Sequence, residues 1–382
     1  MHPEPAAEVR GILERYQRDG LFTHAWWGYG HLDEAAPRRV EALLPDGRSI
    51  FDLASLTKAL VTTPLVFSAN GAGLGLDVTV GQWLEAGKVA RRGELDIRLL
   101  NLSVRSLLAH RSGLPAWRNF WVRCSEGHVQ RSDVSDGFRL NPVEAERALI
   151  AGLNRAAAAI DCGEGQDVGA QKYSDVGFLL LGLSLAWTSG QGLADLWGAW
   201  TRSQLGIDPK SLGLEYAPRL PGLAAKAVPT AHCALRRRDL LGEVHDENCA
   251  ALGGECAHAG IFGTGEAVAS YLHRLFQTDV GRLLWKENAE ARVPPPLERP
   301  PHGWSPNEGL CGWRQGGDPS SEPFGQGMAM GHMGFTGVAF WIRPETRDYS
   351  VFLSNRVSGG RLRPGIAAAR REVFTATAAL AR

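Results

Sequence analysis

The chain has 382 residues, 44% of them hydrophobic, which is enough to bury a large core and to form two or three lobes. Its 41 lysines and arginines balance 41 aspartates and glutamates, so no net field favours nucleic acid or an anionic membrane as a partner. The longest apolar run, Val176–Trp187, is interrupted by glycine and serine and falls short of the ~20 residues of a membrane-spanning helix. The first ten residues lack the basic and apolar regions of a secretory signal, which predicts a cytoplasmic protein.

Hydrophobic periodicity and the positions of glycine and proline predict a mixed set of elements. The N-terminal part is predicted to form, in order, a helix over Ala6–Arg18, strands over Phe22–Gly30 and Ala42–Phe51, and a helix from Ser55 that Pro64 kinks or ends. The middle is mostly helical, most clearly at Val143–Ala159, Val176–Trp187 and Ala267–Phe276. After a long loop over 294–327, strands at Phe335–Ile342 and Asp348–Asn355 precede a closing helix, Ile366–Leu380.

Strands at both chain ends around a helical middle predict an α+β fold. One sheet would be assembled from the two ends of the chain, with an all-helical lobe inserted between them. We therefore expect a single domain over 1–382. Its α/β lobe would cover about 1–65 and 325–382, and its helical lobe about 66–324.

The most informative segment is Phe51–Lys58, in which Ser55 and Lys58 stand three positions apart at the start of a predicted helix. Residues i and i+3 share one face of a helix, so the hydroxyl and the amine can reach each other. A serine hydroxyl is a weak nucleophile until a base takes its proton, and a lysine is such a base only where burial or a neighbouring cation holds it neutral. The pair alone is weak evidence, because Ser-x-x-Lys occurs by chance in many helices.

Two later segments complete an ordered set: Tyr173-Ser-Asp175 before an apolar helix, and His332-Met-Gly334 within Gly331–Gly337. The order Ser-x-x-Lys, Tyr-x-Asp, His-x-Gly resembles the serine β-lactamase and penicillin-binding-protein superfamily, in particular its branch of class C β-lactamases, D-peptidases and esterases. That superfamily has Tyr-x-Asn as its second motif and Lys-Thr-Gly or His-x-Gly as its third. The resemblance covers about Ile50 to Val357, with lesser matches at Ser106–Pro115, Gly242–Asn248, His258–Gly263 and Leu353–Val357.

The resemblance implies a β-lactamase-like fold, in which helices flank an antiparallel sheet and the site lies in the cleft between the sheet and the helical lobe. It implies that Ser55 attacks a carbonyl to form an acyl-enzyme; the alternative is a serine N-cap. Lys58 would be the base for acylation rather than a surface lysine, and its apolar flanking residues predict a lowered pKa for its amine. Tyr173 would exchange protons with the nucleophile and the leaving group, unless it only packs at a helix start.

Asp175 departs from the family's asparagine and has two interpretations. An ionised aspartate only accepts hydrogen bonds. It can hold Lys58 as an ammonium, which raises the pKa of the lysine and makes Tyr173 the better base, or it can cap the helix that starts at Val176.

The third motif is expected to form one wall of the site, with His332 and Gly334 facing the substrate. Gly334 would let a substrate backbone approach closely. By its position in the resemblance, the N–H of Phe335 would pair with the N–H of Ser55 as an oxyanion hole. Four tryptophans in predicted loops either line an apolar pocket or pack locally, namely Trp117, Trp121, Trp304 and Trp313.

No cofactor is expected. The six cysteines show no regular spacing and are expected to be reduced thiols. A loose group of side chains matches no common zinc spacing, and consists of His232, Cys233, His245, Cys249, Cys256 and His258. We therefore expect neither a metal nor an organic cofactor.

The sequence thus predicts a serine hydrolase that acts through an acyl-enzyme on Ser55, with a small-molecule acyl substrate as its partner. An esterase or amidase with weak or no β-lactamase activity is the preferred interpretation. The alternatives are a D-amino-acid peptidase or amidase, a β-lactamase, an acyltransferase, and a catalytically silent binding protein on the same fold. Intact Ser55, Lys58 and Tyr173 argue against the silent protein, because a retired site is free to lose them.

Overall fold

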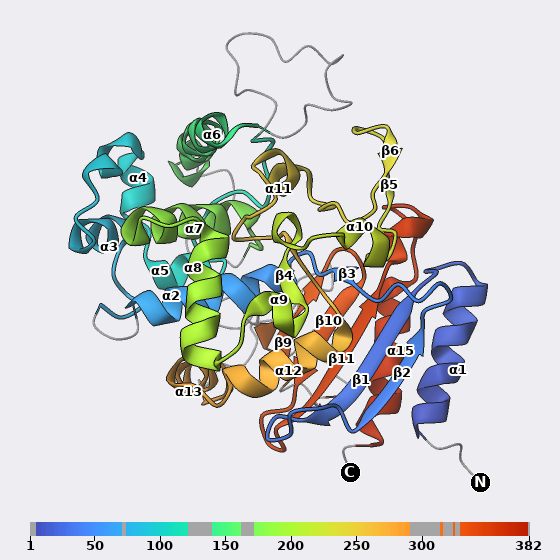
Figure 1. Ribbon diagram of the computed structural model, residues 1–382. Coiled ribbons are helices and arrows are strands. Elements are labelled where there is room, and N and C mark those ends of the chain that lie inside the picture. The colour runs from blue at the N-terminus through green and yellow to red at the C-terminus, as the bar shows by residue number, and fades with distance from the viewer. Residues whose placement is uncertain are drawn as a thin grey trace.

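The computed structural model describes residues 5–70, 74–120, 140–161, 172–290, 314–315, 324 and 329–380. Among these residues, a six-stranded antiparallel sheet has the order β2-β1-β11-β10-β9-β8 (Figure 1). Its strands are β1 (Ala25–His31), β2 (Arg39–Leu43), β8 (Arg314–Gln315), β9 (Met330–Gly334), β10 (Val338–Ile342) and β11 (Asp348–Ser354). N-terminal β1 pairs with C-terminal β11, so the two chain ends build one sheet, as the sequence predicts.

Smaller sheets join the order β3-β7-β4 and the pair β5-β6, from β3 (Phe51–Asp52), β4 (Leu214–Tyr216), β5 (His232–Cys233), β6 (Arg238–Asp239) and β7 (Ile261–Gly263). The helical segments are α1 (Pro5–Arg18), η1 (Lys58–Thr62), α2 (Thr63–Asn70), α3 (Val80–Ala86), η2 (Ala90–Glu94), α4 (Ile97–Leu100), α5 (Val104–Leu108), α6 (Pro142–Asp161), α7 (Asp175–Ser189), α8 (Leu193–Trp200), η3 (Thr201–Leu205), α9 (Pro209–Leu212), η4 (Ala217–Arg219), α10 (Leu223–Lys226), α11 (Glu247–Ala251), α12 (Gly265–Leu275), α13 (Asp279–Trp285), η5 (Lys286–Glu290), η7 (Arg356–Gly359) and α15 (Ile366–Ala378).

The main sheet is covered on both faces. Successive side chains of a strand point to opposite faces. On β1, Trp26 therefore joins the core that includes α12, while Trp27 joins a second core with α1 and α15. Figure 1 shows α15 against the sheet on the side away from α12. Because the strand is buried on both faces, β1 is a continuous apolar and aromatic run instead of an alternating one.

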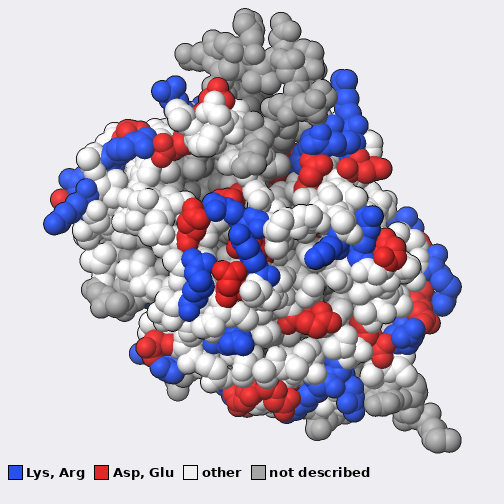
Figure 2. All heavy atoms as spheres, viewed as in Figure 1, with Lys and Arg blue, Asp and Glu red and all other residues white. Residues whose placement is uncertain are grey.

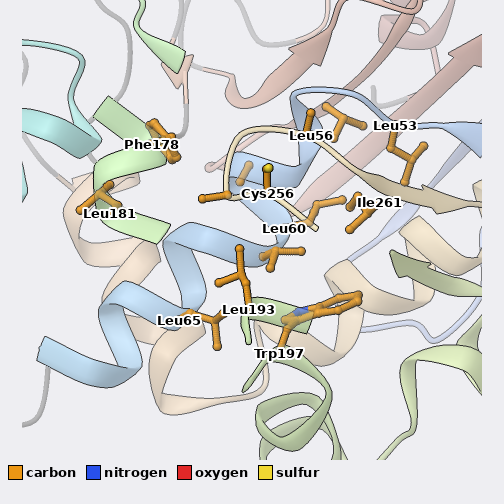
Figure 3. Packing of buried hydrophobic residues seen from close by; sticks show 14 of the residues in the cluster. Leu53, Leu56, Leu60, Leu65, Phe178, Leu181, Leu193, Trp197, Cys256 and Ile261 are labelled. Atoms are coloured by element: carbon orange, nitrogen blue, oxygen red, sulfur yellow. The ribbon is translucent and has the colours of Figure 1, made fainter. Parts of the chain in front are cut away.

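The segment after Ser55 is anchored by the hydrophobic core to which α7 and α8 contribute. Leu56 and Leu60 are fully buried, and Figure 3 shows them in one cluster with Phe178 of α7 and Trp197 of α8. Burying such side chains stabilises the fold by about 1.5–3 kcal/mol each. The apolar face of this segment therefore fixes where its polar face points.

Two predicted strands and one predicted helix differ from the structure in their bounds. The prediction over Ala42–Phe51 is wrong as one strand, because β2 ends at Leu43 and a turn with Gly47 at a φ of 75° separates it from β3. The strand predicted over Phe335–Ile342 begins only at Val338. The helix predicted from Ser55 runs through the π-helical segment η1 directly into α2, so Pro64 does not end it.

The inserted segment is mainly helical but not entirely so. Its described residues also form β4 and β7, and α12 within it packs on β1 and β11. The division into lobes at about residues 65 and 325 therefore stays a prediction. The long loop predicted over 294–327 lies largely outside the described residues, and its described part includes β8.

Charges of both signs are interspersed on the face shown in Figure 2, in keeping with the balanced composition. Within the described ranges, no single helix is long and apolar enough to cross a membrane. Only α7 together with Leu193–Leu205 meets the length and composition criteria, as a pair bent by 72°.

We predict that deleting residues 348–382 prevents folding. The deletion removes β11, which is buried along its whole length between β1 and β10, and the helix α15 that covers one face of the sheet. Soluble expression and thermal melting followed by circular dichroism test this. Leu362→Ser is the control within the same segment, because Leu362 is 94% exposed and its replacement should leave the melting temperature unchanged. A truncated chain that melts cooperatively would contradict the prediction.

Candidate active site

A sharp backbone turn places Ser55 between β3 and the first helical segment. Ala54 has a φ of 46°, a left-handed conformation that is uncommon for a residue with a Cβ atom. Its N–H donates to Asp52 Oδ1 over 2.8 Å, and its carbonyl accepts from the Thr57 hydroxyl over 2.7 Å. These hydrogen bonds hold the turn, and with it the half-buried Ser55.

Lys58 lies beneath Ser55 and is fully buried. Its Nζ is 3.0 Å from Ser55 Oγ, 3.1 Å from the His258 carbonyl oxygen and 2.7 Å from Asp175 Oδ1. An ammonium has three N–H donors; the Ser55 hydroxyl and the His258 carbonyl each accept from one of them, and Asp175 lies within ion-pair distance. The side chain also lies over the Tyr173 ring, with Nζ 4.9 Å from the ring centre.

The pKa of Lys58 is raised, contrary to the lowering that its apolar flanking residues predict. Burial opposes the charge of the amine, but the negative charge of Asp175 and the contact with Tyr173 outweigh that effect. The lysine is therefore an ammonium in the resting structure. The alternative foreseen for Asp175, in which it holds Lys58 charged, matches this geometry.

Ser174, not Asp175, caps α7. The Ser174 hydroxyl accepts a hydrogen bond from the Gly177 N–H over 3.1 Å, as an N-cap serine does. The interpretation of Asp175 as the cap is therefore wrong. Asp175 is the first residue of the helix, and its side chain, 17% exposed, points to Lys58.

Tyr173 completes the group. Its hydroxyl is hydrogen-bonded with Lys58 and Ser55, and burial raises its pKa although the lysine charge opposes that rise. The structure thus brings together Ser55, Lys58, Tyr173 and Asp175, which the sequence presents as two separate motifs. At rest both Lys58 and Tyr173 hold their protons.

His110 packs against Tyr173, a contact that the sequence motifs did not predict. Its ring lies 4.5 Å from the Tyr173 ring, and its Nδ1 accepts from the Ser174 N–H over 3.0 Å. An accepting Nδ1 places the ring proton of a neutral imidazole on Nε2. The signal was present in the sequence, because His110 lies in the lesser match Ser106–Pro115.

The third motif lies on β9, and its histidine is buried. The His332 ring lies 6.1 Å from that of Tyr173, and its Nδ1 is 2.8 Å from the Met333 carbonyl oxygen. A Cβ atom on Gly334 would lie 2.9 Å from the Leu53 carbonyl oxygen. The glycine is therefore required where β9 packs against the turn that carries Ser55, a reason beyond the predicted approach of a substrate.

Phe335 follows β9 and is 45% exposed. Its ring is flanked by the His245 ring at 5.4 Å and by the Arg356 guanidinium at 4.5 Å. Burial and nearby Arg361 lower the pKa of His245 to about 4, so its ring is neutral. The pairing of the Phe335 N–H with that of Ser55 as an oxyanion hole stays a prediction.

Arg370 of α15 fixes the turn between β9 and β10, and sequence patterns gave no signal for it. Its guanidinium donates to the Gly334 and Val338 carbonyl oxygens, each over 2.8 Å. A buried arginine that pairs with carbonyl oxygens fixes the backbone on both sides of the turn. The C-terminal helix thereby positions the residue that follows Gly334.

The predicted tryptophan pocket lies mostly outside the described residues. Trp117 is 39% exposed, whereas Trp121, Trp304 and Trp313 fall in ranges that the structure does not describe. Of the cysteines in the described ranges, Cys233, Cys249 and Cys256 are buried free thiols.

Comparison with known proteins finds solved structures of similar fold. EstCE1, a hydrolase with promiscuous acyltransferase activity, is 17% identical, with coverage of 97% of this chain and 98% of that chain and a TM-score of 0.62. The D-amino acid amidase of Ochrobactrum anthropi SV3, in complex with L-phenylalanine amide, is 17% identical, covers 99% of both chains and has a TM-score of 0.63. A class C beta-lactamase of Rhodobacter sphaeroides is 16% identical, with coverage of 98% and 99% and a TM-score of 0.58.

Structural similarity at such low identity shows the fold alone. No curated protein matches the sequence. The family model described as beta-lactamase, however, matches residues 10–374, nearly the full chain. The chain therefore belongs to the beta-lactamase family of serine hydrolases.

Proposed function

We propose that this serine hydrolase is an esterase or amidase that forms an acyl-enzyme on Ser55. The contact of 3.0 Å between Lys58 Nζ and Ser55 Oγ is the observation that carries the proposal. The Ser55 oxygen accepts from a lysine that is paired with a carboxylate, and the hydroxyl of Tyr173 contacts both groups, so a base lies within reach of the serine proton.

In the resting state, the centre holds one proton more than the reactive state does. Lys58 and Tyr173 both keep their protons at rest, because the pKa of each is raised. Two groups in such close contact titrate as a pair. We assign the reactive form to the pair after loss of one proton, with Tyr173 then taking the proton of Ser55 while Lys58 remains charged.

The remaining steps follow from acyl transfer chemistry. The Ser55 oxygen attacks the substrate carbonyl, and the N–H groups of Ser55 and Phe335 stabilise the developing oxyanion. The proton taken from Ser55 passes to the leaving alcohol or amine, which departs and leaves an ester on Ser55. Water then attacks that ester with the same groups acting in reverse.

The substrate preference rests on which polar groups surround β9. The third motif places His332 and Met333 where the family's Lys-Thr-Gly has a cation and a hydroxyl. Thr336 and Arg356 do not replace them freely, because the Thr336 hydroxyl donates to the Asp52 carbonyl and Arg356 donates to the Phe335 carbonyl. A substrate carboxylate bound there would lose its hydration and gain few hydrogen bonds in exchange. This favours neutral acyl substrates.

A D-amino-acid amidase or peptidase is the second candidate, and Asp175 is the observation that favours it. Its partly exposed carboxylate lies on the same lysine as Ser55. A negative charge beside the reacting carbonyl suits the ammonium group of an amino-acid amide. The amidase from Ochrobactrum anthropi SV3 shares the fold.

We expect a fluorophosphonate probe to label Ser55 alone and Ser55→Ala to abolish turnover without loss of the fold. Lys58→Ala should lower kcat by at least about 10²-fold, the low end for loss of acid–base catalysis, because it removes the charge that helps Tyr173 give up its proton. Intact mass, peptide mapping and ester hydrolysis measure these effects. Ser211→Ala and Lys210→Ala are matched controls, since both residues are exposed on α9. Labelling at another residue, or an unchanged rate in Ser55→Ala, would refute the assignment.

The second prediction for this site concerns pH. The charge of Asp175 raises the pKa of both Lys58 and Tyr173. Asp175→Asn removes that charge, so both pKa values should fall and the reactive form should appear at lower pH. The rise of kcat/KM toward alkaline pH should therefore shift down by about one pH unit or more. Asp195→Asn, at a side chain that is 57% exposed, is the control. If the alkaline rise of kcat/KM stays at the same pH or shifts to higher pH, the Lys58–Tyr173 pair is excluded as the titrating group.

The third prediction separates the candidate substrates. We expect kcat/KM for p-nitrophenyl butyrate to exceed that for p-nitrophenyl hemisuccinate, which matches it in length but carries a carboxylate, and for a chromogenic cephalosporin. D-phenylalanine p-nitroanilide and its L-enantiomer test the amidase candidate, which requires a preference for the D form. A clear preference for the cephalosporin would instead identify a β-lactamase.

A further inference from the structure

We propose that Asp52 and Asp246 form a brace that fixes the nucleophile and the catalytic lysine relative to each other. The brace consists of Asp52, the dipeptide His245–Asp246 and His258. It unites the two lesser motifs Gly242–Asn248 and His258–Gly263, for which the proposed mechanism has no other use.

Asp52 is the first half of the brace. It is 4% exposed, and its two carboxylate oxygens accept from different segments. Oδ1 accepts from the Ala54 N–H and Oδ2 accepts from the His245 N–H, each over 2.8 Å. Both oxygens are therefore engaged, and one of them holds the strained residue directly before Ser55.

Asp246 is the second half. Its Oδ1 accepts from the Cys249 N–H over 2.7 Å, which caps α11, and lies 2.9 Å from His258 Nε2. The His258 side chain is 1% exposed, and its own carbonyl accepts from Lys58 over 3.1 Å. The neighbouring residues His245 and Asp246 thus reach Ser55 through Asp52 and Lys58 through His258.

A brace of this kind serves catalysis because the reacting atoms tolerate little displacement. A misplacement of 1 Å can lower a rate by about 10²-fold. Ala54 is held in its left-handed conformation at its N–H by Asp52 and at its carbonyl by Thr57. Asp52 and Asp246 do not touch the substrate in this scheme, so they are positioning residues.

Because Asp52 can be protonated, the brace predicts a pH dependence of the reaction rate at Ser55 that a purely structural contact would not give. Burial raises the pKa of Asp52 to about 6; the hydrogen bonds from the His245 and Ala54 N–H groups and the charge of Arg236 oppose that rise, whereas the charge of Asp246 adds to it. A protonated carboxyl presents an O–H where it had presented a lone pair, so it no longer accepts from both backbone N–H groups. The brace therefore loosens as the pH falls below about 6.

The test measures the rate at which a fluorophosphonate labels Ser55, by intact mass. Asp52→Asn and Asp246→Asn should each slow labelling about tenfold or more at pH 7.5, with the fold retained by circular dichroism. The double variant should lose less than the product of the two effects, because both act through His245–Asp246. Glu215→Gln is the matched control, since Glu215 is a carboxylate that is 4% exposed and accepts a single backbone N–H, that of Tyr216, over 2.7 Å. Its labelling rate should stay within about twofold of the wild type.

The pH arm uses the unmodified protein and remains decisive if Asp52→Asn does not fold. Labelling of the wild type should fall more steeply below pH 6 than above it, because loss of the brace adds to the one-proton dependence of the Lys58–Tyr173 pair, and folded Asp52→Asn should keep a single slope. A wild-type slope that stays the same between pH 5 and 7.5, or folded variants that label at the wild-type rate, would overturn the brace. The inference rests on the proposed function, and the two fail differently: an unlabelled wild type refutes the nucleophile, whereas a labelled wild type with unaffected variants refutes only the brace.

Discussion

The buried charge of Lys58 is the constraint on which the structure around Ser55 depends. A buried ammonium is costly unless each of its donors finds an acceptor. The acceptors come from separate parts of the chain: the nucleophile turn, the first turn of α7 and the carbonyl of His258. Satisfying one charge therefore holds the nucleophile turn, α7 and the segment before β7 together, and it leaves the Lys58 ammonium 3.0 Å from the Ser55 hydroxyl oxygen.

The main sheet contributes the opposite wall by a different kind of constraint. Gly334 admits no side chain because β9 packs on the Leu53 carbonyl, and Arg370 holds the adjoining turn from α15. Thr336, two residues after Gly334, also donates a hydrogen bond from its hydroxyl to the Asp52 carbonyl oxygen. The wall and the nucleophile are thus joined by backbone contacts, which tolerate less displacement than contacts between flexible side chains. The two chain ends must pair in one sheet before this wall exists.

The aspartate at position 175 sets this chain apart from the asparagine of the motif that it resembles. It offers Lys58 a full negative charge at 2.7 Å, and so shifts the balance of protons toward the charged lysine. Structural relatives at 16–17% identity include a hydrolase with promiscuous acyltransferase activity, a D-amino acid amidase and a class C beta-lactamase, which share the fold. Differences in substrate among proteins of one fold arise from the site, not from the scaffold. We therefore expect the substrate preference of this chain to depend on the groups at Asp175, His332 and Phe335.

The sequence by itself determined the ordered motifs and most of the regular elements, because these depend on residues near each other in the chain. Ser55 and Lys58 share a face through helical spacing, and the bounds of α1, α7 and α15 agree with periodicity to within a few residues. Only the tertiary structure decided the charge of Lys58, since flanking leucines predicted a lowered pKa and the distant Asp175 raised it. It likewise decided that Ser174 is the cap, that His110 supports Tyr173, and that Asp52 reaches His245. Electrostatic interactions and hydrogen bonds act through space, and distances between residues far apart in the chain exist only once the core has packed.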